Sequence, residues 1–207
     1  MPFEDAYNEA LNLAREELSA KDPVQIADRT GGSWNKTENG KGILGLDFWA
    51  GRCNVHFPSV EIAPVLKLPE QIVVLHYLLH AQGVPLKGNW ITFRQIPSGI
   101  FYYDPFVKRC LKPFKSTFGN NPEVLEKIRG DEDSPSAGEV GDVSLVTCPL
   151  PRIPIAFVIW KGDEEFPPES SILFDETAPL FLPTEDIVVL TGIVTYRLIG
   201  RAKDLLK

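Results

Sequence analysis

The segment from Leu68 to Gln82 constrains this chain more than any other part of the sequence. Its periodicity is that of a helix, which Gly83 ends. On a helical wheel its apolar side chains surround the axis almost completely, and only Glu70, Gln71 and Gln82 point outward. A helix that is apolar on nearly every side has to be covered by other elements. The sequence therefore predicts a central helix within a packed domain.

Strands and further helices are predicted around this helix. Two runs at 43–49 and 52–57 are typical of a hairpin, and residues 143–146, 153–160 and 172–175 are predicted strands. Residues 90–96 and 99–103 are expected as two more strand-like pieces. Helices are predicted over 3–20, after Asp22-Pro23, and from Thr184 toward the C-terminus. The fold class is therefore α+β, a single domain over 1–207 with a mainly antiparallel sheet, a C-terminal helix and a mobile acidic loop at 130–142.

A helix that opens at Asp104-Pro105 carries a proline at position 113. Proline lacks the N–H of the helical bond, and its ring collides with the carbonyl four residues back. We therefore expect this helix to end near Lys112 or to kink there. Four basic residues along it form either the solvated face of the helix or an anion site: Lys108, Arg109, Lys112 and Lys115.

Composition limits the functional classes that need to be considered. With 43% hydrophobic and 24% charged residues the chain is globular, and no apolar run reaches the roughly 18 residues of a membrane span. A net charge of −7 argues against a nucleic-acid partner. The acidic N-terminus predicts a cytoplasmic protein. The three cysteines are too widely spaced for a C-x-x-C motif, so we expect no iron–sulfur cluster within this chain.

Two histidines are the first candidate site. His76 and His80 lie one helical turn apart, a spacing that allows two imidazoles to share a metal ion. The zinc-protease pattern places a glutamate after the first histidine, but here Tyr77 follows. Metal or tetrapyrrole ligation, a polar binding or proton-transfer role, and structural packing all remain open. If the helix is buried, we expect burial to lower the pKa of both rings.

An acidic turn and an aromatic segment are the other candidates. The acidic turn consists of Asp163, Glu164 and Glu165, which follow a predicted buried strand. These three carboxylates could form a cation site, a solvated turn or a docking surface for a basic partner. The segment Trp90–Tyr103, with Arg94 within it, is a candidate ligand-binding surface. The sequence contains no phosphate-binding glycine loop and no hydrolase nucleophile motif.

Several short blocks also resemble a known family. They occur in a consistent order over roughly residues 70–190: Leu75–Leu78, Gly88–Arg94, Pro151–Pro154, Trp160–Pro167 and Ile172–Asp175. Together they resemble an uncharacterised bacterial and archaeal domain-of-unknown-function family found mainly in anaerobes. Some of its members are joined to a four-cysteine iron–sulfur module, which this chain lacks. The resemblance implies a role in corrinoid, metal-cofactor or one-carbon metabolism. It identifies no catalytic residue.

Two functional hypotheses follow from the sequence. The first is a binding or accessory protein, recognising a small molecule or a protein partner such as an iron–sulfur or corrinoid protein through the aromatic segment and the acidic turn. The second is a metal-dependent enzyme using His76 and His80.

Overall fold

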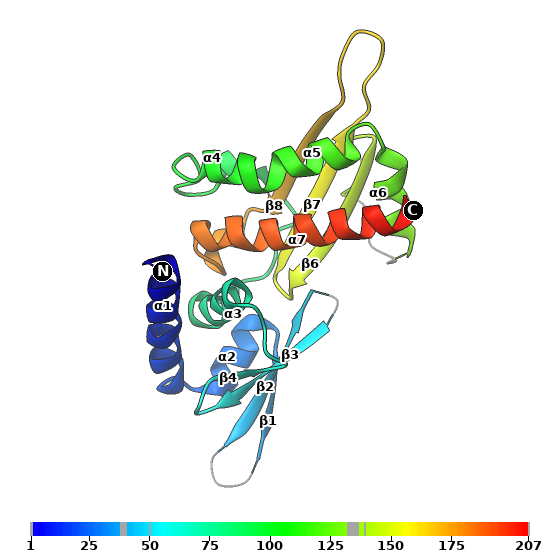
Figure 1. Cartoon of the computed structure of the whole chain (residues 1–207). Coiled ribbons are helices and arrows are strands. Elements are labelled where there is room, and N and C mark those ends of the chain that lie inside the picture. Colours follow the sequence, from blue (N-terminus) through cyan, green and yellow to red (C-terminus); the bar gives the residue numbers. More distant parts are fainter. Residues whose placement is uncertain (1, 38–40, 50, 132–136, 139, 207) are drawn as a thin grey trace.

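The computed structural model describes residues 2–37, 41–49, 51–131, 137–138 and 140–206. The fold consists of two antiparallel sheets and a set of helices (Figure 1). The helices are α1 (Pro2–Ser19), α2 (Pro23–Thr30), α3 (Leu68–His80), α4 (Tyr103–Phe106), α5 (Lys112–Phe118), α6 (Pro122–Asp131) and α7 (Thr184–Leu205). The strands are β1 (Ser33–Lys36), β2 (Gly42–Phe48), β3 (Gly51–Phe57), β4 (Glu61–Ala63), β5 (Trp90–Thr92), β6 (Val143–Leu150), β7 (Ile153–Trp160) and β8 (Glu169–Asp175).

The first sheet has the order β1-β2-β3-β4 and is built around the predicted hairpin. Its two long strands pair from Gly42 with Phe57 to Phe48 with Gly51. Helix α2 precedes this sheet and has the predicted start, because Asp22 Oδ1 accepts a hydrogen bond from the Val24 N–H at 2.9 Å. It ends at Gly31, whose φ of 72° is a left-handed conformation that glycine adopts without steric cost.

The second sheet has the order β5-β8-β7-β6 and carries α5, α6 and α7 on one face (Figure 1). Strand β7 is buried along its whole length except at Trp160, as expected for an interior strand. Phe114 of α5 packs on Phe157 of β7, with their ring centroids 5.1 Å apart. The two sheets are linked where the Trp49 N–H donates a hydrogen bond to the Pro149 carbonyl at 2.8 Å.

Helix α3 is central, as predicted. It packs against α1, α2 and α7, and Val73, Leu75 and Leu78 are fully buried. The prediction that Glu70 points to solvent is wrong, because its side chain is 11% exposed and bound to Arg197 of α7 at 2.7 Å. One contiguous core runs from this helix into both sheets. The described residues therefore form one α+β domain, with two antiparallel sheets.

The two strand-like pieces at 90–96 and 99–103 are largely not strands. Only Trp90–Thr92 joins the second sheet, and Phe93–Gln95 is a 3₁₀ turn. Local hydrogen bonding explains the turn, because Gln95 Oε1 accepts bonds from both the N–H and the hydroxyl of Thr92 at 2.8 and 2.9 Å. Residues 99–102 are turns that lead into α4.

The helix that carries Pro113 does not end at Lys112. Helix α4 continues through a π turn, Val107–Leu111, directly into α5. In this wider turn the Lys112 N–H donates to the Val107 carbonyl, five residues back. The change of hydrogen-bond spacing just before Pro113 accommodates the proline within a continuous helical rod.

The acidic loop predicted at 130–142 lies partly outside the described residues, which exclude 132–136 and 139. Of the remainder, Asp131 is the last residue of α6. Ala137 is buried, and its N–H donates to Ser144 Oγ at 2.9 Å. Within the described part of the chain, none of the helices has the length and hydropathy that a bilayer crossing needs.

Candidate functional site

A histidine–carboxylate pair joins the central helix to the C-terminal helix. His76 lies in the middle of α3, and Asp186 lies in the first turn of α7, where the helix dipole favours an anion. His76 Nδ1 lies 2.7 Å from Asp186 Oδ2, and the two side chains are 24% and 11% exposed. Because the carboxylate holds Nδ1, it fixes the ring orientation and leaves Nε2 as the nitrogen that can meet a ligand.

The environment shifts the pKa values of the two histidines in opposite directions. The hydrogen bond with Asp186 raises the pKa of His76 above its usual value of 6.5, although burial acts against it. Burial lowers the pKa of His80, and the charge of His76 lowers it further. The expectation that burial lowers both values is therefore wrong for His76. The sequence analysis missed the raised pKa of His76 because the carboxylate that causes it belongs to Asp186, which lies 110 positions away in the chain.

These opposite shifts predict a specific pH dependence. A raised folded-state pKa means that the His76–Asp186 pair stabilises the protein fully below pH 6.5 and loses this contribution as pH rises through the folded pKa. We expect His76→Gln to cost about 1 kcal/mol of unfolding free energy near pH 6 and less near pH 9, measured by urea denaturation.

NMR titration of the rings provides the independent check. The His76 signal should titrate above pH 6.5 and the His80 signal below it. In the His76→Gln variant the His80 pKa should rise, because a neighbouring positive charge is removed. Two rings that titrate together near the unperturbed value would contradict this account.

A cavity of about 280 Å³ lies beside the pair, between α1, α3 and α7. Its lining residues are Tyr7, Ala10, Pro69, Ile72, His76, Glu185, Asp186 and Val189. Apolar side chains form most of this wall, and His76 with the two carboxylates supplies its charged groups. Such a setting is typical of small-molecule sites, in which a few polar groups orient a ligand held by apolar contacts.

His80 lies next to His76 but on the exposed side of α3. The two ring centroids are 5.8 Å apart and the ring planes cross at 76°. This separation is compatible with two imidazoles around one ion. Among the described residues, however, no group of three His, Cys, Asp or Glu side chains converges as a metal-ligand set. A metal held here would take its remaining ligands from a bound molecule or a partner.

The structure brings together two of the three residues chosen from the aromatic segment and places the third elsewhere. Arg94 lies over the Tyr103 ring, with Cζ 3.9 Å from the ring centroid. This cation–π contact links Arg94 to the first residue of α4. Trp90 packs with Leu173 and Val158 in a small cluster apart from the main core. Trp90 thus lies apart from the Arg94–Tyr103 pair, and a ligand-binding role for the segment stays a prediction.

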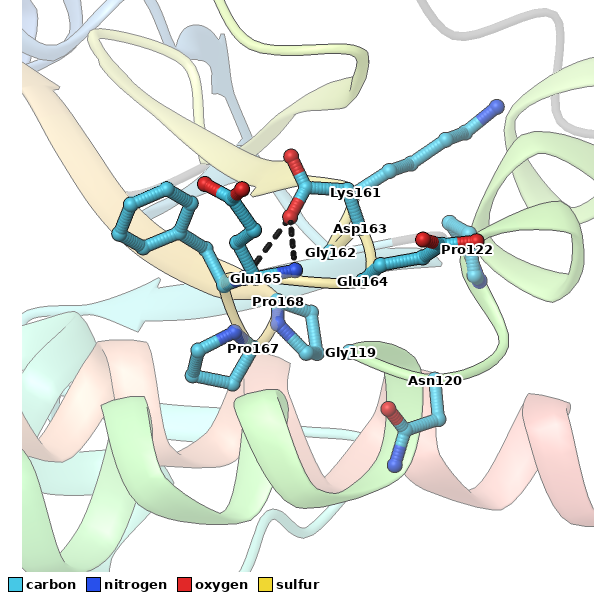
Figure 2. Close-up of a pocket in the computed structure, with 11 residues that line it drawn as sticks. Gly119, Asn120, Pro122, Lys161, Gly162, Asp163, Glu164, Glu165, Pro167 and Pro168 are labelled. Atoms are coloured by element: carbon cyan, nitrogen blue, oxygen red, sulfur yellow. Dashed lines mark hydrogen bonds between the residues drawn. The ribbon is translucent and has the colours of Figure 1, made fainter.

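The acidic turn between β7 and β8 lies in another part of the molecule, beside the α5–α6 connection (Figures 1 and 2). Asp163 Oδ1 accepts hydrogen bonds from the N–H groups of Glu165 and Phe166 at 2.8 and 2.7 Å. These bonds lower the pKa of Asp163 and give its carboxylate a turn-forming role. Figure 2 shows Glu164 and Glu165 pointing away from each other.

His76 and His80 are thus adjacent, and of the ligand-binding candidates singled out from sequence only His76 lines the largely apolar cavity between α1, α3 and α7. The sequence analysis singled out neither Asp186 nor Tyr7 as a site residue. No periodicity or motif connects Asp186 with His76, because the two lie on different helices and meet only after packing.

Fold and site together define a small α+β domain with a histidine–carboxylate pair in the wall of a cavity. Comparison with protein families gives a match to the model described as domain of unknown function (DUF3786), over residues 22–197. The chain belongs to this family. No curated protein and no solved structure matches this chain.

Proposed function

We propose that this chain is a binding or accessory protein that holds a small ligand through His76 in the cavity between α1, α3 and α7. The observation that carries this proposal is the 2.7 Å contact between His76 Nδ1 and Asp186 Oδ2. A carboxylate on one ring nitrogen is the partner that metal-ligating histidines usually have, because it orients the ring and makes the other nitrogen more basic. We therefore propose a metal-containing ligand.

The ligand class follows from this chemistry and from the resemblance described above. We propose a metal ion or corrinoid of anaerobic one-carbon metabolism, in a cytoplasmic protein that cooperates with an iron–sulfur or corrinoid protein. A cavity of about 280 Å³ is at the small end for ligand sites. It suits an ion with small exogenous ligands or one edge of a larger cofactor, rather than a whole macrocycle. Three cysteines that form no disulfide support a reducing compartment.

The test is titration of protein purified without a metal-binding tag. Co²⁺ and hydroxocobalamin are the two probes, followed by visible spectroscopy, since imidazole coordination to cobalt changes the spectrum. We expect His76→Gln to abolish the spectral change. Asp186→Asn should weaken binding by about 10–100-fold, the usual effect of removing a carboxylate that orients a metal ligand.

His56 provides the matched control, because it is the remaining histidine of the chain and lies on β3 in the first sheet. His56→Gln should bind both probes as the wild type does. If His76→Gln binds either probe with unchanged affinity, His76 is not the ligand and the proposal is wrong for that probe.

A metal-dependent enzyme using His76 and His80 is the second candidate, favoured by the 5.8 Å separation of the two rings. It predicts that His80→Gln abolishes Co²⁺ binding as completely as His76→Gln does. The binding-protein proposal predicts that His80→Gln retains the His76-dependent spectral change.

A further inference from the structure

A second, larger cavity adjoins the His76 cavity along α7. Its volume is about 630 Å³, within the range of small-molecule sites. The two cavities share Tyr7, Pro69 and Val189. The larger one is further lined by Lys67, Glu70, Arg109, Val188, Gly192, Ile193, Tyr196 and Arg197.

The charges around this cavity are not balanced. Arg197 is neutralised by Glu70, since their side chains form an ion pair at 2.7 Å. Lys67 and Arg109 form no ion pair with any described residue. Two basic residues without an ion-pair partner among the described residues therefore belong to the cavity lining, in a chain whose net charge is −7. The sequence left open whether Arg109 belongs to a solvated helix face or to an anion site, and the structure places it in the lining of this cavity.

Gly192 is an unexpected residue in this position. It lies inside α7, where glycine destabilises a helix relative to alanine. A Cβ at this position would meet only the Cys110 Sγ, at an ordinary contact distance of 3.9 Å. Neither close packing nor backbone conformation therefore requires glycine here. Its absent side chain leaves space in the cavity, which a larger residue would occupy.

We propose that this cavity binds a small organic anion with an apolar body, of the medium-chain carboxylic acid class. The anionic group pairs with Arg109 and Lys67, and the hydrocarbon lies over Gly192 against Val188 and Ile193. Arginine matches a carboxylate with two parallel N–H bonds. The proposal goes beyond the ligand at His76 and does not depend on it.

Octanoate is the probe, with binding to the full chain measured by calorimetry. Octylammonium has the same tail with the opposite charge, and acetate has the same charge without the tail. We expect octanoate to bind and the two comparison compounds to bind at least tenfold more weakly. Equal binding of octanoate and octylammonium would overturn the role of the basic groups, and equal binding of octanoate and acetate would overturn the role of the apolar wall.

Substitutions then locate the site. Arg109→Gln should weaken octanoate binding by about tenfold or more, whereas Lys112→Gln, which removes an exposed charge outside the cavity lining, should not change it. Gly192→Leu should block the cavity. Gly200→Leu is its matched control, because Gly200 lies on the same helix with no atom within 4 Å of an added Cβ.

Gly192→Ala keeps the test decisive if the leucine variant does not fold. Alanine should raise Tm by about 2–4 °C through helix propensity, and it should also weaken octanoate binding. Unchanged octanoate affinity in both Gly192→Ala and Arg109→Gln would overturn the proposal. His76→Gln should leave octanoate binding intact, so failure of this site and failure of the His76 site are separate results.

Discussion

Leu75→Ala is expected to lower the free energy of unfolding by about 2–5 kcal/mol. Leu75 of α3 is fully buried, and helices α1, α2 and α7 pack against α3. Truncation removes the transfer free energy of the lost methyl groups and leaves a cavity that the surrounding helices only partly fill. Urea denaturation followed by circular dichroism measures the change, provided that the slope with denaturant stays constant.

Leu13→Ala is the matched control for this substitution. Leu13 lies on α1 and is 60% exposed. The same chemical change there should alter the unfolding free energy by no more than about 0.5 kcal/mol. Equal effects at the two positions would contradict a central α3 and with it the packing of the domain.

Tyr77→Phe is expected to cost about 2–3 kcal/mol, a large effect for the loss of one oxygen atom. The Tyr77 hydroxyl donates a hydrogen bond to the Thr30 carbonyl at 2.7 Å and accepts one from the Arg152 N–H at 3.2 Å. It therefore ties α3 to the end of α2 and to the β6–β7 turn. Phenylalanine keeps the ring and leaves both backbone groups without this partner.

The control is Tyr196→Phe, because Tyr196 is 59% exposed on α7. Its unfolding free energy should stay within about 0.5 kcal/mol of the wild type. A Tyr77→Phe variant as stable as this control would mean that water replaces the lost hydroxyl, and that the hydroxyl does not hold the three segments together.

Local elements with a strong signal could be predicted from the sequence. The 43–57 hairpin, the apolar strand β7 and the capped start of α2 all form as predicted, since each depends on side-chain alternation or on a hydrogen bond within a few residues. The prediction of strands was wrong where a strand and a turn are competing local conformations. Residues 93–103 have strand-forming side chains, but a Thr92–Gln95 hydrogen-bond network favours a turn.

The candidate sites depend on a different kind of information. The sequence identified His76 and His80 by their spacing on one helix, and it identified Arg109 by charge. It did not connect His76 with Asp186, or Arg109 with Gly192, because these pairs lie on separate helices. The apolar periodicity of a helix determines that it is buried, but the helices packed beside it determine which polar groups meet at its surface. The sequence by itself thus determined the local elements and the central helix, and only tertiary packing decided the histidine–carboxylate pair and the charged cavity along α7.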